Sequence, residues 1–310
     1  MLTNFLSVLI QVLILLILIS LGFILTKRNL LTEQGAKGMT NVVLYLVIPC
    51  VMINSFSSYD FSVSALKTLG YGVLVALLLH AVFIAVSLIF LKDKDVATSR
   101  VIRFGAVFSN CGFMSLPLQE AILGESGLFL GVIYVAIFNL VSWTYGLVLI
   151  SGDKKQLSLK KLITNPGIIG FLLGLILFFL SATLPQVVAK PIEYISALNT
   201  PLPMLIIGFY IAKSKLLDAI SDKKCMLCVA FKLIVIPASA LLLMFVCGVR
   251  GDMLIAMTIA SSAPIATITT MFSEKFGANT KLSASAVSIS TVLSLITMPL
   301  LITIAQTIAY

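Results

Sequence analysis

Two apolar stretches of the chain carry the polar side chains that are best placed to do chemistry. In the first, Ser109 and Asn110 come seven to eight residues before Pro117. In the second, hydroxyl side chains surround Pro264, and they are Ser261, Ser262, Thr267, Thr269 and Thr270. An amide inside an apolar segment is costly unless it has a hydrogen-bond partner. We therefore predict that the two stretches form one binding site.

The prolines indicate why this site would suit an anion. A proline inside a helix removes one backbone hydrogen bond and clashes with the preceding turn, so it interrupts the helix. The half-helix after each break points backbone N–H groups, with a partial positive charge, toward the break. No Asp or Glu occurs in the intervals 104–119 and 253–273, which argues against a cation as the substrate. The pattern favours a carboxylate; the alternative is that the prolines merely kink packed helices.

The elements that must hold these residues are membrane-spanning helices. Hydrophobic residues make up 60% of the 310 positions and charged residues 11%, and the mean hydropathy is +1.14. Soluble domains are about 45–50% apolar and about 25% charged. The composition therefore predicts an integral membrane protein in contact with the lipid bilayer, and it excludes an ordinary soluble fold.

Intervals without charge predict the number of helices. A transmembrane helix needs about 20 apolar residues to cross a hydrocarbon core of about 30 Å. Ten intervals of at least 16 residues contain no Asp, Glu, Lys or Arg, and they are 1–26, 38–59, 68–91, 104–119, 126–152, 162–189, 194–212, 233–249, 253–273 and 282–310. We therefore predict an all-α integral membrane protein with ten transmembrane helices.

The positive charges predict the orientation of these helices. Seventeen Lys and Arg residues fall in the loops after the odd-numbered predicted helices, three fall in the loops after the even-numbered ones, and Lys232 is the remaining one. Positive loops stay on the cytoplasmic side, so both termini are predicted to lie outside the cytoplasm of a cell-membrane protein. The net charge of +9 then reflects topology, and we expect no nucleic-acid partner.

The spacing of the prolines indicates an internal repeat. Pro49 and Pro203 are 154 residues apart, and Pro117 and Pro264 are 147 residues apart. Two units of five helices would enter the membrane in opposite orientations, which is the inverted repeat of secondary transporters. Broken helices at corresponding positions of the two halves point to the binding site. The predicted organisation is a first five-helix repeat over 1–150, a cytoplasmic linker over 151–163 and a second, inverted repeat over 164–310.

Few residues are available for enzymatic chemistry. The sequence has one histidine, no G-x-x-x-x-G-K-[ST] loop for phosphate and no cluster spaced for metal ligation. The predicted loops are too short to hold a soluble domain. Five scattered cysteines imply no disulfide framework. We expect no enzymatic activity, no metal and no cofactor.

Five segments, in a fixed order along the chain, carry a family resemblance. They are NVVLYLVIPCVMINSF (41–56), SNCGFMSLPLQEAILGESGL (109–128), FNLVSWTYG (138–146), NPGIIGFLLG (165–174) and APIATITTMFSEKFGANTKLSASAVSISTVLSLITMPL (263–300). Together they cover most of the chain and resemble the auxin efflux carrier family. That family includes plant PIN carriers and bacterial malate and malonate permeases.

The resemblance implies a five-plus-five inverted fold in which broken helices 4 and 9 cross. It also implies a scaffold domain, elevator-like movement, a carboxylate-bearing substrate and a homodimer. Asn110 resembles an Asn that holds the substrate carboxylate in the plant carriers, and Pro117 and Pro264 resemble the prolines of the crossing. Ile265 departs from the plant pattern, which has a polar residue there, and the long central loop of many plant members is missing. Both departures favour the compact prokaryotic branch over an auxin carrier.

Further residues within the apolar intervals are weaker candidates. His80 suits proton coupling because histidine titrates near neutral pH, although a buried histidine bonded to a neighbouring carbonyl explains it equally well. Asn54 and Asn139 either line the site or hydrogen-bond between helices. Lys232 is expected to snorkel to the cytoplasmic interface rather than bind substrate. The substrate-binding candidates are Ser109, Asn110, Pro117, Ser262, Pro264, Thr267, Asn139 and Asn54, and His80 is the candidate for coupling.

We predict a secondary active transporter of small organic anions, such as the dicarboxylates malate and malonate, that works by alternating access where helices 4 and 9 cross. Three alternatives stay open. One is an efflux carrier for auxin-like aromatic carboxylates. Another is a sodium-coupled symporter of the bile-acid type, for which the missing acidic residues are unfavourable. The third is a membrane sensor that binds the anion without transporting it.

Overall fold

The computed structural model describes residues 2–59, 61–214 and 220–310, with side chains from Val8 onward. Within these ranges every regular element is a helix, and extended chain pairs only in one antiparallel bridge between Ser109 and Ile265. This confirms the predicted all-α class.

The elements are α1 (Leu2–Lys27), α2 (Glu33–Val42), η1 (Val43–Val47), α3 (Ile48–Ser57), α4 (Val63–Phe90), α5 (Val96–Val107), η2 (Cys111–Ser115), α6 (Leu116–Val141), η3 (Ser142–Gly146), α7 (Leu147–Ser151), η4 (Lys154–Gln156), α8 (Leu159–Ile163), α9 (Pro166–Phe179), α10 (Gln186–Ser196), η5 (Ala197–Asn199), α11 (Pro201–Lys213), α13 (Lys223–Ala230), η6 (Phe231–Val235), α14 (Ile236–Val246), α15 (Gly251–Ser262), α16 (Ile268–Lys275) and α17 (Thr280–Ala309).

Seven helical runs in the described part of the chain are long and apolar enough to cross a membrane. They are Val8–Lys27, Glu33–Ser57, Val63–Phe90, Cys111–Ser151, Gln186–Lys213, Lys223–Val246 and Thr280–Ala309. Large apolar side chains on α1, α4 and α9 are exposed, as expected of surfaces that face lipid. The structure therefore supports a multi-span helical protein, whereas the count of ten spans stays a prediction.

Interrupted and short helices account for the difference between seven and ten. The run Cys111–Ser151 is 41 residues long and changes direction at Gly124, whose φ of 62° lies in the left-handed region that favours glycine. Helices α5 and α15 have 12 residues each, α9 has 14 and α16 has eight. Each is shorter than the roughly 17–25 residues of a full membrane crossing.

Three of the prolines follow a wide helical turn. Pro49, Pro117 and Pro237 are each the second residue of an α-helix that continues from a five-residue π-helix. In each case the residue before the proline donates its N–H to the carbonyl five positions earlier rather than four. A proline has no N–H to donate and would clash with the carbonyl of the preceding turn, so the wider turn gives its ring room without ending the helix.

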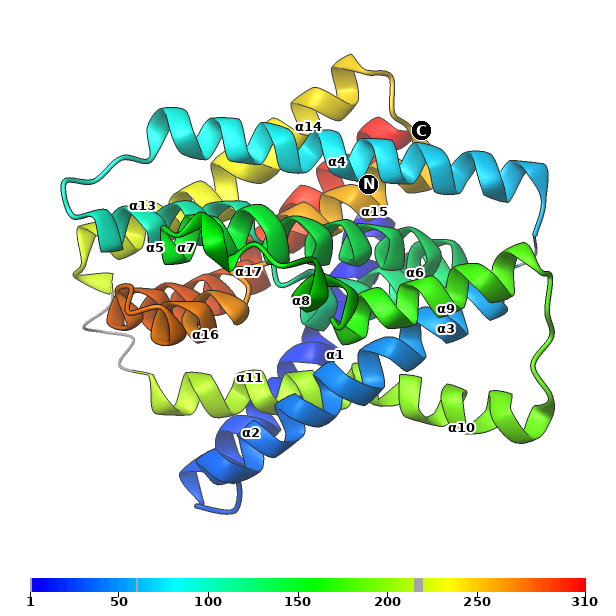
Figure 1. Cartoon of the computed structure of the whole chain (residues 1–310), viewed down its shortest axis with the longest axis horizontal. Coiled ribbons are helices and arrows are strands. Elements are labelled where there is room, and N and C mark those ends of the chain that lie inside the picture. Colours follow the sequence, from blue (N-terminus) through cyan, green and yellow to red (C-terminus); the bar gives the residue numbers. More distant parts are fainter. Residues whose placement is uncertain (1, 60, 215–219) are drawn as a thin grey trace.

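The helices form two groups, which we name the panel and the core bundle. The panel comprises α1, α2, α3, α9, α10 and α11, in which α1 packs along α11 and α3 packs along α9. The core bundle comprises α4 to α7 and α13 to α17, in which α15 packs against both α6 and α17. Figure 1 shows α10 and α11 along one edge of the molecule and α4 toward the opposite edge. Contacts of α1 with α6 and α17, and of α9 with α6, join the two groups.

Glycines set the close packing inside the panel. A Cβ atom at Gly208 of α11 would overlap the carbonyl oxygen of Ile19, and one at Gly22 of α1 would overlap that of Leu205. On α9, Cβ atoms at Gly170 and Gly174 would likewise meet the backbone of α3. Small residues four apart let helix backbones approach closely where apolar lipid offers no hydrophobic driving force. Close backbone packing therefore helps to hold the panel together.

Candidate functional site

Two helices stop inside the core bundle, and new ones start after a short extended segment. Helix α5 ends at Val107 and the next helical run begins at Cys111, while α15 ends at Ser262 and α16 begins at Ile268. Pro264 lies in the second extended segment, where it has no N–H with which to continue α15. Each segment therefore has the C-terminal end of one helix on one side and the N-terminal end of another on the other side.

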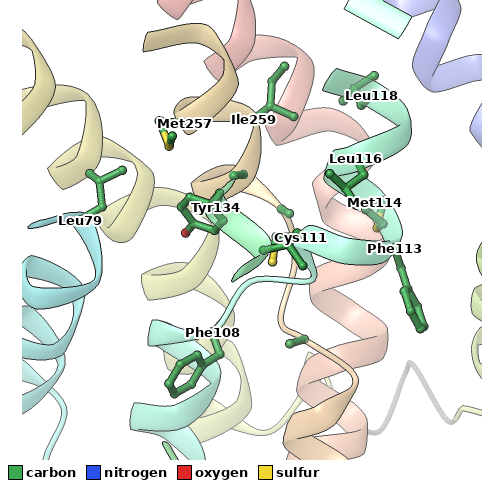
Figure 2. Close-up of a cluster of buried hydrophobic side chains, with 14 of the residues drawn as sticks. Leu79, Phe108, Cys111, Phe113, Met114, Leu116, Leu118, Tyr134, Met257 and Ile259 are labelled. Carbon is green, nitrogen blue, oxygen red and sulfur yellow. The ribbon is translucent and has the colours of Figure 1, made fainter. Parts of the chain in front are cut away.

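The two extended segments cross and pair with each other. The N–H of Ala266 donates to the carbonyl of Phe108 at 3.0 Å, and the N–H of Asn110 donates to the carbonyl of Pro264 at 2.7 Å. Figure 2 shows this crossing, with Cys111 beside it and Tyr134 facing it from a neighbouring helix. Because backbone groups away from water need partners, this pairing lets irregular chain exist deep in an apolar bundle. The structure thus brings together the two stretches that the sequence singled out.

Asn110 occupies the N-cap position of the helical run that leaves the crossing. Its side chain is 5% exposed, and its Nδ2 atom has no hydrogen-bond partner among the described residues. Leaving a buried donor without a partner costs about 1–3 kcal/mol. An unpaired amide at a helix N-terminus is a donor available to a bound oxygen atom.

The neighbouring hydroxyl groups have different roles. Ser109 Oγ lies 3.4 Å from the carbonyl oxygen of Ser261, so it joins the two interrupted helices. Ser262 Oγ donates to the carbonyl of Ile259 in its own helix at 3.1 Å. Thr267 is partly buried and occupies the N-cap position of α16, without a capping hydrogen bond from its side chain. Thr267 and Asn110 therefore stand at equivalent places, each at the start of a half-helix.

Lys232 contradicts the expectation that it snorkels to the interface. Its side chain is fully buried, and Nζ donates to Ser109 Oγ at 2.5 Å and to the carbonyl oxygen of Ser261 at 3.2 Å. The wide turn before Pro237 places Lys232 in the middle of a helix of the core bundle. The sequence does not reveal this inward direction, because it depends on the wide turn; the available signal was a lysine inside a predicted span.

A histidine and a tyrosine lie beside the crossing. His80 is buried, and its Nδ1 pairs with the carbonyl oxygen of Ala76 at 2.8 Å, as the simpler interpretation of this residue expected. The ring of His80 is 5.1 Å from that of Tyr134 and 6.5 Å from that of Phe108. His80 Nε2 and the Tyr134 hydroxyl have no hydrogen-bond partner in the described chain. Tyr134 was missed from the sequence because nothing distinguishes it from a packing residue there.

Three predicted site residues lie elsewhere. Pro117 is buried in α6, past the crossing and within the helix rather than at its break. Asn54 belongs to α3 of the panel. Asn139 donates from Nδ2 to the carbonyl of Val135 in its own helix at 3.0 Å, and a Cβ at Gly167 of α9 would be 2.7 Å from that Nδ2. Of the substrate-binding candidates, the structure therefore gathers Ser109, Asn110, Ser262, Pro264 and Thr267.

A cavity of about 230 Å³ lies between the panel and the core bundle. The core bundle contributes the first turns of α6, and the panel contributes α1 and the turn before α11. The lining residues are Gln11, Ile14, Leu15, Pro117, Leu118, Glu120, Ala121 and Thr200. Glu120 and Gln11 give this mostly apolar cavity a few polar groups. Pro117, which lines the cavity, lies about two helical turns after the crossing.

No group of three or more His, Cys, Asp or Glu residues that could hold a metal ion occurs in the described ranges. The three ion pairs that the structure describes are Lys37–Glu33, Lys190–Glu193 and Lys224–Asp93, and all involve side chains outside the crossing. The electrostatics of the crossing therefore come from Lys232 and from helix ends rather than from carboxylates.

Interrupted helices that cross inside an apolar bundle, with polar groups at their ends, are the arrangement of a secondary transporter. Comparison with known proteins gives the same class. A family described as "Membrane transport protein" matches residues 7–302. The chain belongs to this family, which is the auxin efflux carrier family that its motifs resemble, and it is a multi-pass membrane transporter rather than an enzyme.

Two archaeal relatives are similar over nearly their full length. One is an uncharacterized transporter of Methanothermobacter thermautotrophicus, 26% identical over 294 residues that cover 93% of this chain and 95% of the relative. The other is an uncharacterized transporter of Methanocaldococcus jannaschii, 26% identical over 303 residues that cover 93% of this chain and 96% of the relative. Both names agree with transport and give no substrate.

Proposed function

We propose that this protein is a secondary active transporter of small organic anions, such as the dicarboxylates malate and malonate, across the cell membrane. The observation that carries the proposal is the buried amide of Asn110, which has an unpaired donor at the start of a half-helix among the described residues. The substrate carboxylate would accept from this amide. Alternating access would expose the crossing to one side of the membrane at a time.

The charges around the crossing support an anion. The half-helices that begin near Cys111 and Ile268 each present about half a positive charge at their N-termini. No Asp or Glu stands in the intervals 104–119 and 253–273 that form the crossing. A carboxylate bound at the crossing itself would meet the amide of Asn110 and positive potential, and Glu120, which lines the adjoining cavity, lies outside the crossing.

The size of the cavity beside the crossing supports a small substrate. Its volume of about 230 Å³ is below the roughly 300–1,000 Å³ of pockets for drug-sized ligands. A four-carbon dicarboxylate fits this volume, and so does a compact aromatic acid. The cavity lies between the panel and the core bundle, where a sliding movement of one group past the other would open or close it.

We further propose that the chain forms ten spans in two inverted repeats of five, with both termini outside the cytoplasm. The interruption between α5 and η2 would correspond to that between α15 and α16, one in each half. The halves would be 1–150 and 164–310, joined by the linker 151–163. The panel would serve as the scaffold of a homodimer, and the core bundle would move against it with proton coupling through His80.

The test is uptake of radiolabelled malate by proteoliposomes, with and without an imposed pH gradient. The expected result is uptake that the gradient accelerates. Asn110→Ala removes a hydrogen bond to a charged group, which is worth about 1.5–3 kcal/mol, so it should lower uptake roughly 10- to 100-fold. The matched control is Asn165→Ala, because Asn165 caps α9 in the panel and lies outside the crossing.

The outcomes separate the alternatives. Normal uptake by Asn110→Ala would show that the site is wrongly assigned. Uptake of an aromatic carboxylate but not of malate would favour an auxin-like substrate. Binding of malate without flux would favour a sensor. If a pH gradient still accelerates malate uptake by His80→Gln, His80 has no part in proton coupling.

A further inference from the structure

Lys232 is a buried cation that has no carboxylate partner among the described residues. Its side chain is 0% exposed, and none of the ion pairs in the described chain includes it. Its two hydrogen bonds go to Ser109 Oγ and to the carbonyl oxygen of Ser261, on the two interrupted helices. Burying an ammonium group is costly unless it is paired and hydrogen-bonded, so something at the crossing must balance its charge.

The C-terminal ends of two helices supply that balance. Helix α5 ends at Val107, two residues before Ser109, and Ser261 is in the last turn of α15. Each helix C-terminus carries about half a negative charge on carbonyl groups without intrahelical partners. Nζ contacts a carbonyl of one of these ends, that of Ser261, and a hydroxyl two residues past the other, that of Ser109, so both ends place partial negative charge near the ammonium group.

Local structure fixes the ammonium group in this place. The wide turn over Phe231–Val235 precedes Pro237 and contains Lys232. One turn earlier, Cys228 Sγ donates to the carbonyl of Ile102 on α5 at 3.6 Å, which fixes this helix against α5. The side chain therefore reaches both interrupted helices from a third helix that is itself packed on one of them.

We infer that Lys232 is a resident cation of the crossing, which takes the place where the converging carbonyl ends would otherwise require a monovalent cation from solution. Its positive charge leaves the N-terminal ends of the half-helices free to attract an anion. Transport is therefore independent of sodium. The inference deepens the proposed function, since the anion is the transported substrate, but cation binding to a Lys232 variant is measurable without any transport.

The first experiment measures thermal unfolding of the purified protein in detergent, in chloride salts of sodium, potassium, choline and methylammonium at equal ionic strength. The wild type is expected to unfold at the same temperature in all four salts. Lys232→Ala leaves a space beside the carbonyl oxygen of Ser261 and the hydroxyl of Ser109, so sodium or methylammonium should raise its unfolding temperature relative to choline by ligand stabilisation. Lys213→Ala is the matched control, because Lys213 is an exposed lysine in the last turn of α11.

The second experiment measures malate uptake in the same salts. Wild-type uptake should be equal in sodium and in choline. Lys232→Met, which keeps the length of the side chain but has no charge, should lose at least about tenfold in uptake, as expected when a buried charge-assisted contact is removed. Methylammonium should restore part of the uptake of Lys232→Ala and none of that of Lys232→Met, whose side chain fills the space.

The inference is overturned if wild-type uptake or wild-type unfolding depends on sodium, if Lys232→Met transports like the wild type, or if Lys232→Ala responds to no cation. If neither Lys232 variant folds, the uptake and the unfolding temperature of the wild type in sodium and in choline still test the inference. Absence of malate flux in every salt would contradict the proposed function alone, because the unfolding measurements test the resident cation separately.

Discussion

The panel and the core bundle are both helical, but different interactions hold them together. In the panel, side chains such as Thr26 and Thr40 donate within their own helices, to the carbonyl groups of Gly22 and Ala36. In the core bundle, side chains bond between helices, as Gln119 does to the carbonyl of Ala256 at 2.8 Å. Close contacts of glycine with a neighbouring backbone are a feature of the panel, and hydrogen bonds between helices are a feature of the core bundle.

This difference fits a division of labour. Two helices whose backbones are in close contact at glycines fit together in one arrangement, because a shift would open gaps or cause overlap between them. Polar groups at interrupted helices can exchange a protein partner for a ligand or a water molecule. The comparison therefore indicates a fixed panel beside a core bundle whose polar contacts can change as substrate binds.

The largest effect is expected where a glycine of the panel is filled. Gly208→Leu would place side-chain atoms onto the backbone of Ile19 and Phe23, so overpacking should cost at least the roughly 1–3 kcal/mol usual for such changes. Gly70→Leu is the control, because a Cβ at Gly70 in α4 meets no atom within 4 Å. Thermal unfolding in detergent measures both. Equal stability of the two variants would show that the panel does not depend on its glycines.

A smaller loss of stability is expected from a polar contact of the core bundle. The N–H of Ile265 donates to Ser290 Oγ at 3.1 Å, so Ser290→Ala would leave a buried donor unpaired at a cost of about 1–3 kcal/mol. Ser294→Ala is the control, because the hydrogen bond that the structure describes for Ser294 Oγ goes to the carbonyl of Thr291 in its own helix, at 2.8 Å. If both variants unfold at the same temperature, the bond from α17 does not support the crossing.

Gln119→Leu should separate transport from stability. The change removes one hydrogen bond between α6 and α15, worth about 0.5–1.5 kcal/mol, but it also removes Gln119 Oε1, a buried acceptor without a partner in the described chain. The unfolding temperature should therefore change little. Malate uptake should fall several-fold, because the half-helix after the crossing loses its tie to α15. Unchanged uptake would show that this bond has no part in the mechanism.

The smallest effect is expected at the ion pair between Lys224 and Asp93. The hydrogen bond and charge of Lys224 hold the pKa of Asp93 below its usual range. A carboxyl group with a lowered folded pKa stabilises the fold above the unfolded pKa of about 3.9, and this contribution is lost as the pH falls through the folded value. The unfolding temperature of the wild type should therefore fall slightly more in acid than that of Asp93→Asn. A steeper fall for the variant would contradict this.

Particular residues show what the sequence could predict. Asn110 and Pro264 were recognised because a polar amide and a proline are conspicuous in apolar stretches, and the structure places both at the crossing. Lys232 was misjudged because its direction depends on a wide turn, which hydrophobic periodicity does not reveal. Pro117 was assigned to the break because a proline usually ends a helix, but here a π-turn accommodates it.

The wide turns before Pro49, Pro117 and Pro237 have a consequence for the outer surface of these helices. An α-helix advances about 100° per residue, so one extra residue in a turn rotates everything after it by about a quarter of a circle relative to everything before it. The residues that face lipid therefore follow one sequence spacing before the turn, and this spacing is shifted by one residue after it. A single-residue deletion inside Phe231–Val235 would turn Ile234 and its lipid-facing neighbours toward the inside of the bundle. The lipid-facing and the buried surfaces would then be exchanged over half of the helix.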